Sequence, residues 1–188
     1  MRHIAIILAA LAATSPATAQ GWQEYAYPNY FFSVAFPAEP KIETTTYQTS
    51  EGGAVEARIY SVANDTGVFK MTIADLSNAS VPETAVIGHA VKSMSEGGEI
   101  KVDIAHRIRR VYGRQLTITN ADGHHLFVAV FYHKQRLYQI EGKALTGGDE
   151  AMTDALRFQQ SLDFTENASN RATPGGKAER QGRPPRRI

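Results

Sequence analysis

The chain has 188 residues and no cysteine, which excludes disulfide bonds, thiolate metal centres and a lipid-attachment cysteine. Its formal net charge of +1 conceals two regions of opposite sign. Residues 166–188 carry six Lys and Arg against two Glu, whereas residues 20–165 carry 13 Lys and Arg against 17 Asp and Glu. The body is therefore mildly acidic, at −4, and the carboxyl-terminal segment is basic, at +4.

The amino-terminal residues have the three parts of a secretory signal peptide. Arg2 and His3 precede an apolar run over residues 4–13, and small residues then lead to Ala19. The apolar run is too short to span a bilayer, and no later stretch of the sequence reaches that length. We therefore expect cleavage after Ala19, a soluble mature chain without a transmembrane segment, and a periplasmic or secreted location.

Residues 166–188 have almost no large apolar side chain and are rich in Gly, Pro and Arg. Such a segment cannot bury enough surface to offset its conformational entropy, so we expect a disordered basic tail. Residues 20–165 then form a single domain, which is large enough to bury about two-thirds of its surface.

The first half of the domain alternates apolar and polar residues at the period of a β-strand. An aromatic-rich lead-in over residues 22–30 comes before the first strand, which Pro37 ends. Turns at 50–53 and 64–67 separate the later strands, so consecutive strands are expected to pair antiparallel. The predicted strands are residues 32–36, 41–48, 54–62 and 68–76.

The period changes to that of a helix at Pro82. Apolar residues recur at spacings of three and four as far as Met94, and Gly97-Gly98 end the element. Alternation then returns over residues 100–108, whose apolar side chains are expected to share one face. A corner is predicted at Val111-Tyr112-Gly113, before a further strand over residues 115–120.

Residues 123–145 are the predicted centre of the domain. Residues 127–131 form an unbroken apolar run, which indicates a strand covered on both faces. A tight turn at Lys134-Gln135 leads into a strand from Arg136 that alternates apolar and polar residues, and we expect its polar face to see water. A capped helix follows from Asp149, with an apolar stripe that reaches Leu162.

The predicted order of four strands, a helix, four strands and a helix describes an α+β domain with an antiparallel sheet and helices packed on its faces. Residues 22–164 resemble the PsbP/Mog1-like family of small exported or organellar domains. The resemblance lies in the segment FFSVAFPAEPKIE, the mid-chain helix and the ending RLYQIEGKAL…DEAMTDALRFQQSLDF. It implies that fold and an accessory or binding role, and it implies no shared catalytic residues.

The six histidines lack the spacing of a metal site. His124 and His125 are adjacent on a strand and point to opposite faces, while His125 and His133 lie roughly 26 Å apart along an extended strand. The sequence also contains no Gly-x-Ser-x-Gly motif, no His-Glu-x-x-His motif and no phosphate-binding loop. We therefore predict no metal, no cofactor and no catalytic set.

One charged cluster is a candidate anion-binding site. Its members, on either side of the predicted corner at 111–113, are Arg107, Arg109, Arg110 and Arg114. Their planar guanidinium groups could bind phosphate or carboxylate bidentately. Alternatively, they pair with nearby acids or protect a sheet edge. Since strand alternation places Arg107 and Arg109 opposite to Arg110, the patch is compact only if the chain bends at Gly113.

The sequence favours an exported, non-catalytic binding or accessory module that acts through a sheet face or through the cleft between sheet and helices. Its expected partner is a protein or an anionic envelope surface, and no nucleic acid. Two alternatives stay open: a hydrolase-like enzyme with an unrecognised site, and an envelope-surface adaptor that uses the basic tail.

We expect export to remove residues 1–19. Amino-terminal sequencing of the protein from the exported fraction should therefore read from Gln20. A chain that keeps its leader in the membrane fraction would show instead that residues 4–13 act as an anchor.

Overall fold

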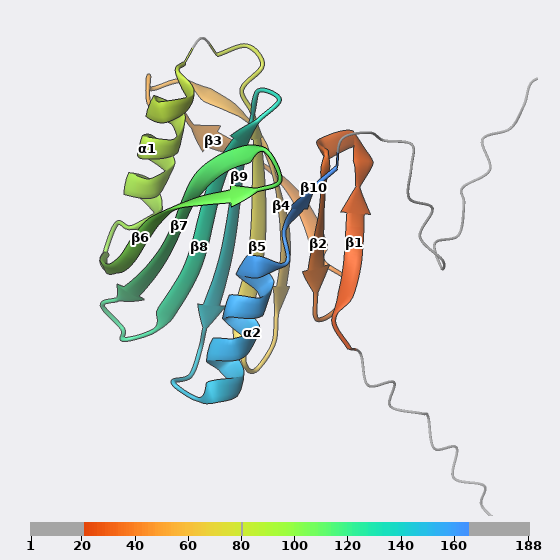
Figure 1. The fold of residues 1–188 in the computed structure, drawn as a ribbon, viewed down its shortest axis with the longest axis vertical. Helices are drawn as coiled ribbons and strands as arrows, with labels where there is room; N and C mark the ends of the chain where they lie inside the picture. The colour runs from red at the N-terminus through yellow and green to blue at the C-terminus, as the bar shows by residue number, and fades with distance from the viewer. Residues whose placement is uncertain (1–20, 80, 166–188) are drawn as a thin grey trace, which may run out of the picture.

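The computed structural model describes residues 21–79 and 81–165. The predicted signal peptide at 1–19 and the predicted basic tail at 166–188 lie outside the described residues. Within the described part, two antiparallel sheets and two α-helices form the domain (Figure 1). Neither of these helices is long and apolar enough to cross a membrane.

The larger sheet has seven strands in the order β3-β4-β5-β9-β8-β7-β6, and every neighbouring pair is antiparallel. All but one of its connections between sequence neighbours are hairpins, because only the step from β5 to β6 carries a helix. The strands are β3 (Lys41–Gln48), β4 (Ala54–Ala63), β5 (Gly67–Asp75), β6 (Gly98–Ile108), β7 (Val111–Asn120), β8 (His125–His133) and β9 (Arg136–Ala144).

The two helices cover opposite faces of this sheet. Helix α1 (Glu83–Met94) begins and ends where the sequence predicts, and it buries Val86 against Val128 and other residues of one face. Helix α2 (Asp149–Gln160) packs on β9, β8 and β5, and it buries Phe158 in a cluster that contains Phe131 from the other face. Since Val128 and Phe131 alternate along β8, both faces of that strand are covered.

A small sheet lies beside α2, as Figure 1 shows in orange and red for β1 and β2. Its strand order is β1-β2-β10, and the 3₁₀ turn η1 (Pro28–Tyr30) joins its first two strands. Phe32 and Phe36 from this sheet are fully buried against aromatic rings of the larger sheet and of α2. The strands are β1 (Gln23–Tyr27), β2 (Phe32–Phe36) and β10 (Asp163–Phe164).

The small sheet corrects the predicted order of elements. Strand β1 lies in the segment that the sequence predicts as a lead-in, and β10 follows α2, so five strands precede α1 and one follows α2. Strand β1 has only two inward-facing residues, Tyr25 and Tyr27, and β10 has only two residues in all, so neither is long enough to show a clear alternating pattern in the sequence. Both exist because they pair with β2.

The prediction for β8 is confirmed, since Val128, Ala129, Val130 and Phe131 are buried, with Phe127 half-buried at the end of the run. The middle of the sheet, however, is β9, between β5 and β8. The expectation that the polar face of β9 sees water is therefore wrong at Gln139, which is only 8% exposed. The predicted turn at Lys134-Gln135 is confirmed, and both of its residues have positive φ.

Strand β6 is an edge strand with a β-bulge between Ile100 and Val102. Ile100 pairs with Ile118, whereas Val102 pairs with the neighbouring Thr117, so the alternation slips by one residue. The prediction that Ile100 shares a face with Val102 and the later apolar residues of this strand is therefore wrong.

The corner predicted at 111–113 lies two residues earlier. Arg109 and Arg110 form the turn between β6 and β7, with Arg109 in the left-handed region at φ 55°. Gly113 is instead inside β7, where a Cβ atom would stand 2.1 Å from the carbonyl oxygen of Val130. Its role is to let β7 approach β8 closely, not to bend the chain.

Replacing Phe131 by alanine should cost about 3–5 kcal/mol of unfolding free energy, the range for a large aromatic side chain deleted from a core. Phe131 is fully buried, and its ring lies edge-on to Phe164 with centroids 5.5 Å apart. Urea unfolding measures the change. A loss below roughly 1 kcal/mol would show that this residue is not part of the core.

Two glycine-to-alanine changes should have opposite effects. At Gly142 in β9, a Cβ atom would stand 2.3 Å from the backbone oxygen of Ala155 in α2, so G142A should destabilise the domain by about 1–3 kcal/mol. At the exposed Gly88 in α1, nothing lies within 4 Å, so G88A should stabilise it by roughly 0.5–1 kcal/mol through helix propensity. Equal effects of the two changes in urea unfolding would contradict the close packing of α2 on β9.

Candidate functional site

The four arginines of the predicted anion-binding patch lie on or near the β6–β7 turn, and two of them bind carboxylates of the protein itself. Arg109 donates from Nε and a terminal nitrogen to Asp163, at 2.7 and 2.6 Å. Arg114 donates to both carboxylate oxygens of Asp103, with Nε 2.7 Å from Oδ1. Arg107 lies over the Tyr112 ring at 5.7 Å, and Arg110 is exposed in the turn. These pairs favour the alternative that the cluster makes internal ion pairs.

The histidines have local roles where the structure describes them. His106 packs on the ring of Phe131, and Nδ1 of His125 lies 3.2 Å from the hydroxyl of Thr119. In residues 21–79 and 81–165, no three His, Asp or Glu side chains are grouped so that they could hold a metal ion.

A cleft of about 570 Å³ lies between η1 and the adjoining ends of β4, β5 and β9. Four segments that are distant in sequence meet there because the hairpins of the larger sheet bring these strand ends side by side. Its lining comprises Asn29, Tyr30, Ala54, Val55, Glu56, Ala57, Arg58, Ile73, Asp75, Ser77, Asn78 and Arg136.

Strand alternation aims two arginines into this cleft. Arg58 stands two residues before the buried Tyr60 on β4, and Arg136 stands two residues before the buried Tyr138 on β9. Both tyrosines belong to the aromatic core between the sheets, so both arginines lie on that same face. Arg58 pairs in register with Ile73, and Arg136 pairs with Asp75, so β5 lies between the two arginine-bearing strands.

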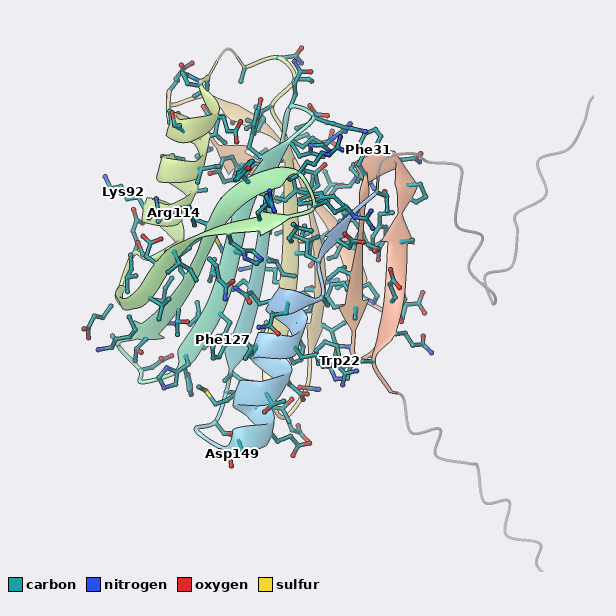
Figure 2. The ribbon with its side chains drawn as sticks, in the orientation of Figure 1. Trp22, Phe31, Lys92, Arg114, Phe127 and Asp149 are labelled. Atoms are coloured by element: carbon teal, nitrogen blue, oxygen red, sulfur yellow. The ribbon has the colours of Figure 1, made fainter. Side chains whose placement is uncertain are left out.

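Aromatic rings pack against both guanidinium groups. The Tyr30 ring centroid lies 5.3 Å from Cζ of Arg58 and 5.8 Å from Cζ of Arg136. The neighbouring ring of Phe31 lies 5.4 Å from Cζ of Arg136 and 3.7 Å from Nζ of Lys134. Figure 2 shows Phe31 at the η1 end of the small sheet, well apart from Arg114. The rings therefore form an aromatic wall around two fixed cations.

Both guanidinium groups keep an unpaired donor. Nε of Arg58 and Nε of Arg136 are buried, and neither has a hydrogen-bond partner among the described residues. The carboxylate nearest to Arg136 is that of Asp75, 3.6 Å from a terminal nitrogen, which is too long for a strong hydrogen bond. A buried N–H without a partner costs roughly 1–3 kcal/mol or more when charged, so these two donors call for a physical explanation.

The groups around the cleft have fixed protonation states near neutral pH. The Tyr138 hydroxyl donates to the carbonyl oxygen of Tyr30 at 3.0 Å, and burial raises the pKa of Tyr138 to about 12. Burial also raises the pKa of Tyr60 to about 12, with a smaller opposing effect of Arg58. Hydrogen bonds from Ser77, and more weakly the charge of Arg136, lower the pKa of Asp75. The buried phenols of Tyr60 and Tyr138 beside the cleft are therefore neutral, and Asp75 in its lining is ionised.

Arg58 and Arg136 could not be recognised from the sequence because they lie on different strands with no motif around either. The available signal was that each is a charged residue two positions before a tyrosine on the same face of its strand. The β6–β7 arginines are predicted as a site because they are close in sequence, whereas Arg58 and Arg136 are brought together by the sheet topology.

Comparison with known proteins supports the fold. No protein-family model and no curated protein match the sequence. The solution structure of cyanobacterial PsbP from Synechocystis sp. PCC 6803 aligns with a TM-score of 0.52 at 12% identity, over 82% of this chain and 98% of that one. A crystal structure of PA94 from Pseudomonas aeruginosa, a protein of unknown function and putative regulator, aligns with a TM-score of 0.38 at 10% identity, over 71% of this chain and 88% of that one. The protein therefore has a PsbP-like fold, as its resemblance to that family predicts.

Proposed function

We propose that the protein is an exported, non-catalytic binding module that holds a partner molecule in the cleft between η1 and the larger sheet. The observation that carries this proposal is the pair of buried, unpaired Nε donors on Arg58 and Arg136. The signal-peptide pattern at residues 1–19 supports export.

The position of the two arginines suits recognition. They stand on β4 and β9, on either side of β5, and pair with Ile73 and Asp75 of that strand. Their backbones are therefore two strand spacings apart across the sheet and two residues apart along it, or roughly 12 Å. Strands in the interior of a sheet move little, and the rings of Tyr30 and Phe31 restrict the guanidinium groups further. A partner would therefore lose little free energy to ordering these side chains.

The chemistry of the cleft supports a non-catalytic role. No histidine is present among the described residues that line it, and the sequence has no cysteine. Asp75 is held by hydrogen bonds from Ser77 that lower its pKa, which makes it a weak general base near neutral pH. Binding is therefore the activity that these groups support best.

Cross-linking from the cleft tests this proposal. Because the chain has no cysteine, the variants N78C and T45C would each carry one thiol-linked photo-cross-linker. Asn78 is exposed at the cleft, whereas Thr45 is exposed on β3 and pairs with Ala57, whose side chain packs on the α1 face of the sheet. Irradiation in intact cells should join N78C, and not T45C, to a discrete partner.

Equal labelling from the two positions would overturn the proposed binding surface. A partner that cross-links only from Asn78 but is chemically converted by the wild-type protein would contradict the non-catalytic part. Unfolding in urea checks that both variants keep the stability of the wild-type chain.

A further inference from the structure

We propose that the cleft is an oxyanion site, in which Arg58 and Arg136 together bind one carboxylate or phosphate group of the ligand. This inference rests on the proposed function and names the chemical class that the cleft selects.

The protein shows elsewhere how its arginines bind an oxyanion. Arg109 uses Nε and a terminal nitrogen to bind both oxygens of Asp163, and Arg114 binds Asp103 with the same side of its guanidinium group. That side-on geometry matches two parallel N–H donors to two acceptor oxygens. At Arg58 and Arg136, the Nε donor of the same pair is buried and unpaired. An oxyanion in the cleft would supply the acceptor that each of these two Nε donors lacks.

Asp75 does not supply that group. Its Oδ1 accepts the backbone N–H of Ser77 at 3.0 Å, and its Oδ2 stays 3.6 Å from the terminal nitrogen of Arg136. The short bond therefore holds this carboxylate on the turn that follows β5. The Nε edge of Arg136 remains unpaired beside it.

The wall of the cleft favours charge-assisted hydrogen bonds. Tyr30 lies close to both guanidinium groups, and aromatic contact of this kind limits their motion without using their N–H donors. Partial burial lowers the local dielectric, which strengthens each such bond relative to water. Phe31, next to Tyr30, has a left-handed backbone at φ 56°, a conformation that costs energy in a bulky residue and that clusters at ligand sites.

The charges of the lining limit the ligand to one oxyanion. Arg58 and Arg136 are balanced in the lining by Glu56 and Asp75, so the cleft has no large positive field. The further negative charges of a polyanion such as a nucleic acid would be repelled by those two carboxylates. A single anionic group between the arginines would avoid that repulsion. Asn29, Ser77 and Asn78 supply polar contacts for the rest of the ligand.

The arginine Nε–Hε resonances test the inference directly. In ¹⁵N–¹H spectra of the full mature chain, titration with inorganic phosphate or with acetate should shift the Nε–Hε signals of Arg58 and Arg136 saturably. The signals of Arg109 and Arg114, whose Nε groups are already bound, should move far less. Saturation by only one of the two probes supports the site. It also shows which group the site selects, a phosphate if phosphate saturates it and a carboxylate if acetate does.

The variants R58K and R136K keep the charge and remove Nε, so each should weaken binding of the effective probe by about tenfold or more. R110K makes the same change at the exposed turn and should leave the affinity unchanged. A shift that never saturates, or one of equal size at every arginine, would indicate general screening and overturn the inference. The titration of the wild-type chain tests the inference even if a lysine variant fails to fold.

Failure of this inference and failure of the proposed function are distinguishable. If neither probe binds but N78C still captures a partner, the cleft is a binding site for a group other than an oxyanion. If phosphate or acetate binds while N78C and T45C label equally, the oxyanion site exists without the partner that we propose.

Discussion

The hydrogen bond from the Tyr138 hydroxyl to the carbonyl oxygen of Tyr30 joins the middle of the larger sheet to the turn between the first two strands of the small one. Tyr138 is fully buried in β9, so its hydroxyl needs a partner there, and the backbone of η1 supplies it. This bond, 3.0 Å long, holds η1 against the sheet. It thereby keeps the Tyr30 ring against Arg58 and Arg136.

The position of β9 explains why one face of the sheet carries both α2 and the small sheet. At Gly142 the backbone of α2 approaches β9 so closely that no side chain fits, and at Tyr138 η1 is bonded to the same strand. Phe158 of α2 and Phe36 of β2 fill the space between these two contacts. On its own strand, each of Arg58 and Arg136 stands two residues beyond the last core tyrosine, and the cleft lies at that end.

Local pattern predicted much of this architecture. The two helices, the strands β2 to β5, and the buried strand β8 follow from the spacing of apolar residues and from turn residues such as Asn64, whose side chain accepts the N–H groups of Thr66 and Gly67. The errors have physical causes. The bulge in β6 has no marker in the sequence, and the turn at Arg109 uses a left-handed residue that is not glycine.

The candidate site could not be predicted in the same way. Arg58 and Arg136 come together only through the pairing of β4, β5 and β9, and strand order is not contained in the alternation of any one strand. The alternation of β9 also cannot show that both of its faces are covered, so the burial of Gln139 could not be predicted from it. Both the meeting of the two arginines and the burial of Gln139 depend on contacts between elements that are distant in sequence. The β6–β7 arginines illustrate the converse, because Arg109 and Arg114 are close in sequence but bind different carboxylates, Asp163 and Asp103.

The central claim is that the two unpaired Nε groups mark a site for one oxyanion. Crystals of the mature chain grown with selenate, an anion that scatters X-rays anomalously, test it most directly. An anomalous peak should lie within hydrogen-bond distance of Nε of both Arg58 and Arg136. Selenate found only at exposed cations such as Arg110, with none in the cleft, would show that the two Nε groups do not form an oxyanion site.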